Sequence, residues 1–214
     1  MNSASIRRCA ARVHATRLLP IALFAALAAG CGTAPPIPVN YAPSSVMTAA
    51  GSLNVGEFNY LPAAAAPAPA ALTAADSKNS KDSARKVKAV AGNQIRNTAM
   101  GNIFIDREVR TFVRDAVFSE LRFVGIKTDG TKVRLTGDIE EFLIDDLGYS
   151  VDWTLRIRYE LRDIATQKVV YESVKNTQRN TNKFANVFGA LNETIKINAE
   201  ELMKDQAFLS AIAL

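Results

Sequence analysis

A strict alternation of apolar and polar side chains along residues 150–162 is the feature that most limits the folds open to this chain. The apolar positions are Val151, Trp153, Leu155, Ile157, Tyr159 and Leu161, and every residue between them is polar. Because successive side chains of a strand point to opposite faces of its sheet, this pattern predicts a strand with one buried face and one face in water. Turns at Leu147-Gly148 and Ala165-Thr166 predict an antiparallel meander, with neighbouring strands over 132–144 and around 168–175.

Segments with helical periodicity lie on either side of this meander. The first is expected to begin after Asp106 as N-cap and to stop at Gly125, and the second follows the polar run 176–182. In both predicted helices the apolar positions recur every three or four residues. They are Val109, Phe112, Val113, Ala116, Val117 and Leu121 in the first helix, and Phe184, Val187, Phe188, Leu191, Ile195, Ala199 and Leu202 in the second. A short terminal helix is expected after Asp205.

These segments together predict the fold class. Residues 50–60 add a strand with a glycine bulge, and residues 103–105 add a short strand. The sequence therefore predicts an α+β two-layer sandwich, with a mainly antiparallel sheet of about four to five strands. Two main helices are expected on the one face of the sheet that carries Trp153 and Tyr159. We expect this to be a single domain over residues 50–214.

The first 31 residues have the layout of a secretory signal that ends in a lipidation site. Arg7, Arg8, Arg12 and Arg17 precede an uncharged run from Leu18 that closes on Ala28-Ala29-Gly30-Cys31. The run is too short to span a bilayer as a permanent helix. The segment resembles a bacterial lipobox, which predicts a lipoprotein signal peptide over 1–30, lipidation of Cys31 and a lipidated tether over 31–49. The alternative is an ordinary secretory signal whose cysteine is incidental.

Removal of residues 1–30 changes what the composition implies. The segment holds four arginines and no acid, so the net charge falls from +5 to about +1, which disfavours nucleic-acid binding. Cys9 and His14 also leave, and the remaining chain has one cysteine and no histidine. This inventory excludes disulfides, thiolate zinc sites and nucleophiles activated by histidine. We therefore expect a non-catalytic protein with no cofactor and no metal.

Residues 62–88 are predicted to be a mobile insertion in the domain. An Ala/Pro tract is followed by a basic stretch that contains Lys78, Lys81, Arg85, Lys86 and Lys88. Neither part has sustained apolar periodicity, so little buried surface would offset the entropy of fixing it. The basic stretch is either a solvated loop or a patch that touches anionic lipid head groups beside the anchor.

Charged residues of the meander offer two candidate sites. The acids are Asp138, Glu140, Glu141, Asp145 and Asp146, and the arginine stripe is Arg156, Arg158 and Arg162. A metal or acid–base site needs several oxygens at one point, whereas alternation sends strand neighbours to opposite faces. Cross-strand pairs, Asp138 with Arg156 and Arg158 with Glu172, are therefore favoured. The arginine stripe is either a solvated sheet face or a partner-binding surface, and it is our candidate binding site.

Several segments resemble the YajG-type family of outer-membrane lipoproteins. They are GSLNVGEFNY at 51–60, IRNTAMGNI at 95–103, the helix ending in Glu120-Leu121 and LTGDI at 135–139. The resemblance runs from about residue 50 to the C-terminus. It implies a lipoprotein with an α+β domain and a role in the cell envelope, held at the outer membrane and facing the periplasm. It supplies no ligand.

Three classes of function remain open. The first, which we predict, is a non-catalytic partner-binding or accessory subunit of an envelope assembly, attached to the outer membrane through its lipid anchor and contacting another envelope protein. The second is an accessory factor in lipid or lipopolysaccharide transport that binds an acyl ligand. That function would need an apolar groove between sheet and helices or an exposed apolar patch. The third is an enzyme that uses acids and hydroxyls alone.

Overall fold

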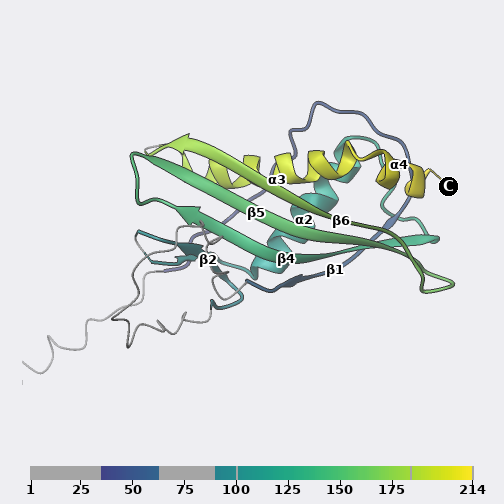
Figure 1. The fold of residues 1–214 in the computed structure, drawn as a ribbon, viewed down its shortest axis with the longest axis horizontal. Helices are drawn as coiled ribbons and strands as arrows, with labels where there is room; N and C mark the ends of the chain where they lie inside the picture. The colour runs from purple at the N-terminus through teal and green to yellow at the C-terminus, as the bar shows by residue number, and fades with distance from the viewer. Residues whose placement is uncertain (1–34, 63–89, 100, 184, 214) are drawn as a thin grey trace, which may run out of the picture. The chain divides into compact units, whose positions relative to one another are not determined.

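The predicted meander forms one side of a six-stranded sheet, with its last strand at the edge (Figure 1). Its strands β4 (Val133–Asp145), β5 (Ser150–Asp163) and β6 (Val169–Asn182) pair antiparallel in that order. Strands β1 (Asn54–Tyr60) and β2 (Gln94–Asn97) both run parallel to β4, and β3 (Ile103–Phe104) pairs antiparallel with β2. β1 lies against the first half of β4 and β2 against its end, so two strands share one edge.

The computed structural model describes residues 35–62, 90–99, 101–183 and 185–213. Within it, Pro36–Leu214 belongs to one compact unit. The predicted signal peptide over 1–30, the lipidation site Cys31 and residues 63–88 of the predicted insertion lie outside the described residues. Over the ranges that are described, no helix is both long and apolar enough to cross a membrane.

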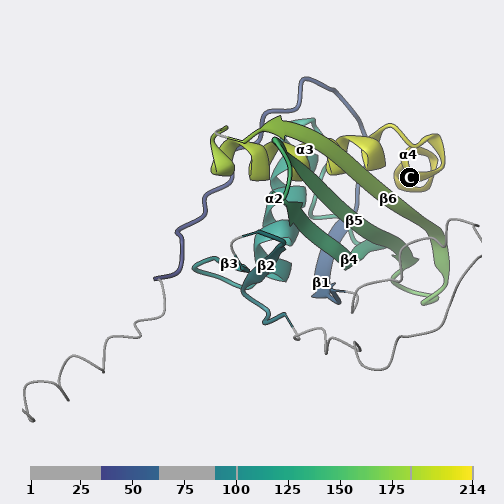
Figure 2. The same cartoon turned by 60° about the vertical axis from the view of Figure 1, so that its left-hand side comes forward.

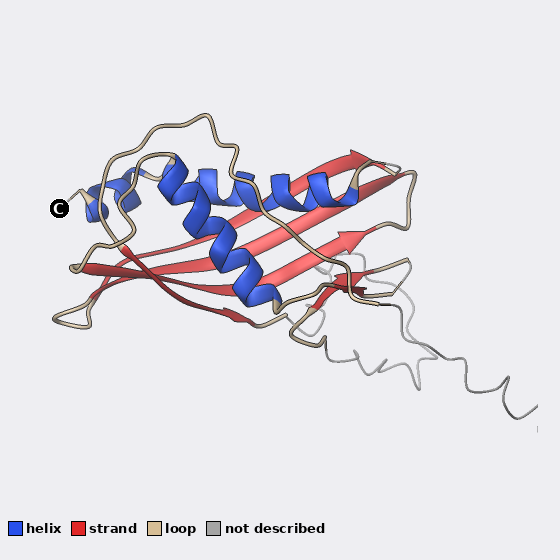
Figure 3. Ribbon diagram, turned by 180° about the vertical axis from the view of Figure 1, so that it is seen from behind, coloured by secondary structure: helices blue, strands red, loops and turns tan. Residues whose placement is uncertain are grey.

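Three helices of the described chain lie on one face of the sheet (Figure 3). They are α2 (Val109–Phe123), α3 (Val187–Met203) and α4 (Gln206–Ile212). Trp153 and Tyr159 point into this layer, with exposed fractions of 2% and 0%. The hydroxyl of Tyr159 donates to Oδ1 of Asn198 on α3 at 2.9 Å. The predicted α+β two-layer sandwich is therefore confirmed, with six strands rather than four or five.

The ends of three predicted elements are corrected by the structure. Residues 176–182 continue β6, because β5 pairs with them as far as the pair Ser150 and Asn182. Asp106 does not cap α2, whose N-cap is Glu108, and its carboxylate instead accepts a bond from the backbone N–H of Val39. The first turn of α3 lies beyond the end of β6, so the side chains of its residues 187 and 188 are 45% and 44% exposed rather than buried.

Residues 36–49, here called the strap, pack along the domain from β3 past the helices (Figure 2). The N–H of Ile37 donates to the carbonyl of Phe104 at 2.8 Å, and the side chain of Val39 is 1% exposed. Asn192 of α3 donates to the carbonyl of Asn40 at 2.9 Å. The prediction of a tether that continues to residue 49 is therefore wrong for residues 36–49. The odd-numbered residues of the strap from 37 to 49 are less exposed than their neighbours, but the prolines at 35, 36 and 38 made the sequence look like a tether.

Glu120 of α2 is the main polar attachment of the strap. It is fully buried, and its carboxylate accepts bonds from the Tyr41 hydroxyl at 2.5 Å and from the N–H groups of Ser44 and Ser45 at 3.1 and 3.2 Å. Burial, and then the bond to Glu120, raise the pKa of the Tyr41 phenol well above its usual value. Three donors from the strap therefore satisfy one buried acid.

Acid should weaken the attachment of α4 to the sheet. Asp205 caps α4, and its carboxylate accepts bonds from Lys175 at 2.7 Å and Tyr171 at 2.8 Å. The bond from Lys175 is the main cause that lowers the pKa of Asp205 to about 2. Because the folded pKa lies below the unfolded value of about 3.9, this stabilisation is present above pH 4 and is lost as pH falls to 2.

Denaturant unfolding between pH 2 and pH 7 measures this contribution. Asp205→Asn, which keeps a capping side chain, should be less stable than the wild type above pH 4, and this difference should shrink as pH falls through 2. A stability difference that does not change with pH would contradict this assignment.

Candidate functional site

The face of the sheet opposite the helices carries the predicted arginine stripe, and no described helix covers it (Figures 1 and 3). Alternation places Arg156, Arg158 and Arg162 of β5 on this open face, because their neighbours Ile157 and Leu161 are buried on the other. The side chains of the three arginines are 46%, 42% and 39% exposed. The structure therefore groups the predicted site residues on one accessible surface.

Each arginine of the stripe already has an acidic neighbour. Glu140 of β4 lies between two of them, 2.7 Å from Arg156 and 2.8 Å from Arg158. Arg158 also contacts Glu172 of β6 at 3.0 Å, as predicted. Hydrogen bonds to Glu172 and then to Glu140 raise the pKa of Arg158 above its usual value. Arg162 pairs with Glu160 and donates to the carbonyl of Gln167 at 2.7 Å.

This network gives the open face compensated charge rather than one strong sign. Pairs this exposed contribute about 0–1 kcal/mol each, because water and salt screen them. A partner with its own charged groups can therefore exchange them at little cost. At one end of the face a cavity of about 180 Å³ is lined by Arg134, Thr136, Glu160, Arg162, Asp163, Ile164 and Gln167.

The acidic residues do not converge on one point. Asp138 accepts a bond from Asn59 at 2.8 Å rather than pairing with Arg156, because the register places Arg158 opposite it. Glu141 pairs with Arg96 at 3.3 Å. Within the described ranges no three His, Cys, Asp or Glu side chains are placed to hold a metal ion. The arrangement suits cross-strand ion pairing.

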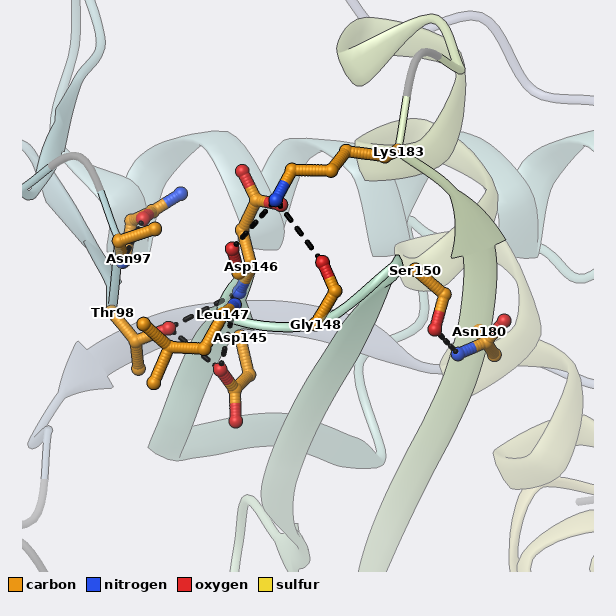
Figure 4. Close-up of polar contacts among 10 residues, drawn as sticks. Asn97, Thr98, Asp145, Asp146, Leu147, Gly148, Ser150, Asn180 and Lys183 are labelled. Carbon is orange, nitrogen blue, oxygen red and sulfur yellow. Dashed lines mark hydrogen bonds and ion pairs between the residues drawn. The ribbon is translucent and has the colours of Figure 1, made fainter.

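A second surface lies at the end of the sheet where the hairpin between β4 and β5 turns (Figure 4). We call this turn, residues 146–149, the hairpin tip. On one side the hydroxyl of Thr98 donates to Asp145 at 2.6 Å and accepts from the N–H of Asp146 at 3.1 Å. On the other side Lys183 donates to the carbonyls of Asp146 and Gly148 at 3.3 and 3.1 Å. These contacts hold the hairpin tip to β2 and to the end of β6.

The hairpin tip exposes large apolar side chains. Leu147 is 72% exposed and Tyr149 is 103% exposed. Val187 and Phe188, in the first turn of α3, are also exposed and follow closely after Lys183. The sequence pattern predicts only a turn at 147–148. The sequence feature that could have indicated this surface is the apolar pair Leu147 and Tyr149, in a turn otherwise made of aspartates, glycine and serine.

A hollow of about 500 Å³ lies at the opposite end of the sheet, beside α4. It is lined by Val133, Asp163, Val170, Ala207, Ser210 and Ala211. Most of these side chains are small, and Val170 is 48% exposed. This is an open surface hollow rather than a groove between the sheet and the two long helices.

Comparison with known proteins shows a fold shared with the first of three solved structures. A structure from Xanthomonas campestris of the DUF330 family matches with a TM-score of 0.53 at 13% identity, covering 81% of this chain and 94% of that one. A Caulobacter crescentus structure described as a "putative lipoprotein" matches 47% of this chain and 82% of its own, with a TM-score of 0.36 at 11% identity. The PelC dodecamer from Paraburkholderia phytofirmans matches 52% of this chain and 84% of its own, with a TM-score of 0.34 at 14% identity.

The sequence itself gives no such match. No family model matches the chain. No curated protein matches it. The similarity to the DUF330 structure therefore shows the architecture of the domain and nothing about its function.

Proposed function

We propose that this chain is an outer-membrane lipoprotein of the YajG type that faces the periplasm and binds another envelope protein as a non-catalytic accessory subunit. The observation that carries the proposal is the lipobox Ala28-Ala29-Gly30-Cys31 placed only five residues before Pro36, where the packed domain begins. An acylated Cys31 would keep the domain at the membrane surface and raise its effective concentration for partners there.

A binding role is favoured over catalysis by the chemistry of the domain. After residue 31 the chain has no cysteine and no histidine, which are the usual nucleophile and general base. The acids on the open face are engaged with arginines, as Glu140 is with Arg156 and Arg158. The open face offers a broad polar surface of the kind found at exchangeable protein interfaces.

Cys31→Ser tests the anchor. Several acyl chains on one residue bind a bilayer far more firmly than one chain does, at about 0.8 kcal/mol per buried methylene. The variant should therefore appear as an unprocessed or released form when membranes are fractionated, while the wild type remains with the outer membrane. A matched Cys9→Ser variant should behave as the wild type. Processed Cys31→Ser protein that still fractionates with outer membrane would contradict lipidation.

Arg156→Gln combined with Arg158→Gln tests the open face. Neutral side chains remove both partners of Glu140 without placing further acids beside it, so stability should fall by no more than about 1–2 kcal/mol. In-membrane crosslinking followed by pull-down should then recover the envelope partner at least about tenfold less well, a change of 1.4 kcal/mol in binding. Arg107→Gln combined with Arg110→Gln, on the helical side, is the matched control.

Two results separate the possibilities. A folded double variant with unchanged crosslinks would remove the arginine stripe as the partner surface. Loss of crosslinks in both the stripe variant and the control would point to a general charge effect rather than to this face.

The acyl-ligand alternative depends on the hollow beside α4. If it takes an acyl chain, mass spectrometry of the purified protein should detect co-extracted lipid. A bulky Ala211→Trp substitution, in the wall of that hollow, should remove this lipid. Recovery of lipid from both proteins alike would assign it to the anchor or to carry-over.

A further inference from the structure

We propose that the hairpin tip contacts the lipid surface of the membrane that holds the anchor, with Leu147 and Tyr149 in the interface. This inference rests on the proposed lipidation of Cys31. It adds to that proposal a definite orientation, in which the domain stands on one end of its sheet and the arginine stripe of β5 rises away from the bilayer.

The direction of the strap shows which end of the sheet its first residues are nearer to. Ile37 bridges Ile105 in parallel, directly after β3. β3 runs antiparallel to β2, and β2 runs parallel to β4, which ends at the hairpin tip. The strap therefore leaves this end of the sheet as the chain proceeds. A short tether before Ile37 therefore starts from the side of Ile37 that is nearer to the hairpin tip.

The length of the tether matches the height of the hairpin tip. Ile105 donates to the carbonyl of Asn93, and Arg96 pairs with Leu143, so Ile37 lies about level with residue 140 of β4. The end of β4 at Asp145 is five residues further on, or about 17 Å at 3.3 Å per residue, and Leu147 lies in the turn beyond it. From Ile37 back to Cys31 there are six residues, which span at most about 20 Å. Even a fully extended tether thus only brings the anchor to the level of the tip.

This reach favours lipid over a protein as the occupant of the hairpin tip. A small domain is about 30 Å across, so no folded partner fits between the tip and a bilayer that holds Cys31. The chemistry agrees with an interfacial position. Tyr149 has an apolar ring and a polar hydroxyl, the combination that is enriched at membrane–water interfaces, and Leu147 adds an aliphatic side chain. Because Thr98 and Lys183 brace the turn, both side chains are presented without further ordering.

The experiment uses the full-length lipidated protein in vesicles of phosphatidylethanolamine and phosphatidylglycerol, with or without brominated acyl chains. The chain has one tryptophan, Trp153, which is 2% exposed and supplies a constant background. Tyr149→Trp places a reporter at the hairpin tip. Val169→Trp places one on an exposed position at the opposite end of the sheet. Brominated lipid quenches only tryptophans that it contacts.

We expect the emission added by Tyr149→Trp to shift to the blue on the vesicles and to be lost with brominated lipid. The emission of Val169→Trp and of the wild type should not change. Leu147→Trp provides a second reporter should the first alter folding. Vesicle flotation and the acyl mass of Cys31 are measured on the same samples. Acylated, floating protein whose Tyr149→Trp emission is quenched no more than that of Val169→Trp overturns this inference alone, whereas protein without an acyl group that does not float overturns the anchor and this inference with it.

Discussion

Trp153→Ala should destabilise the domain by about 3–5 kcal/mol, the usual cost of removing a large buried aromatic side chain. Trp153 lies on β5 beneath the helical layer and is 2% exposed. Its indole N–H donates to the hydroxyl of Thr181 on β6 at 3.0 Å. The substitution leaves a cavity and removes this hydrogen bond, so much of a typical domain's stability would be lost. Denaturant unfolding followed by circular dichroism measures it.

Tyr149→Ala is the matched control, because it removes an aromatic side chain one residue before β5 that is fully exposed. It should change stability by less than about 0.5 kcal/mol. Thr181→Val separates the two parts of the Trp153 effect, since it removes only the hydrogen bond and should cost about 1 kcal/mol. A Trp153→Ala variant as stable as Tyr149→Ala would show that the helices do not pack on this face.

The strands and helices that could be predicted are those whose own residues carry the pattern. Alternation marked the two faces of β5, and Trp153 and Tyr159 are buried as that pattern requires. Along residues 132–144 the apolar positions change phase near Glu140 and Glu141, which indicates a bulge, and the pairing of β4 with β5 shifts register between Ile139 and Glu141. These features are local. They follow from side-chain direction within one strand.

The pairing of strands that are far apart in the sequence could not be predicted from a local pattern. Nothing within residues 54–60 or 94–97 indicates that both pair in parallel with β4 and share its edge. The strap was missed because its prolines are typical of a tether, although Val39 is buried and Tyr41, Met47 and Ala49 pack against the core at alternating positions. Burial of Glu120 could not be predicted either, because its donors come from residues more than 70 positions away.

In the candidate site, too, the local features could be predicted and the long-range pairings could not. Arg156, Arg158 and Arg162 share one face because they alternate with apolar residues, which is visible in the sequence. The pair Arg158 with Glu172 was predicted from the short turn between β5 and β6. The pair Asp138 with Arg156 was wrong, since the longer turn at 146–149 and the bulge decide which residues face each other. A shift of two residues changes a charged partner while leaving the face unchanged, because side chains alternate between the faces with a period of two.

Glu120→Ala should release the strap from α2 and destabilise the domain by about 3 kcal/mol. The loss arises because the Tyr41 hydroxyl and the N–H groups of Ser44 and Ser45 lose a charged acceptor, at about 1–3 kcal/mol for each group left buried and unpaired. Detachment of the strap lets water satisfy these groups, which limits the total. Limited proteolysis should then cleave within 36–49, where the wild type resists.

Two variants define the cause. Glu120→Gln keeps one carbonyl acceptor and should lie between the wild type and Glu120→Ala. Asp115→Ala removes an exposed acid from the same helix, where it pairs with Arg114, and should leave the strap protected and cost less than about 1 kcal/mol. Cleavage within 36–49 that is equal in all of these proteins would show that Glu120 does not fix the strap.

Release of the strap also changes the distance between the anchor and the domain. With residues 36–49 detached, the tether gains up to 14 residues, or about 45 Å when extended. The hairpin tip is then no longer held at the level of Cys31. Glu120→Ala combined with Tyr149→Trp should therefore lose much of its quenching by brominated lipid while its acyl anchor stays in the vesicle. Quenching that persists in this variant would mean that Leu147 and Tyr149 bind lipid strongly enough without a short tether.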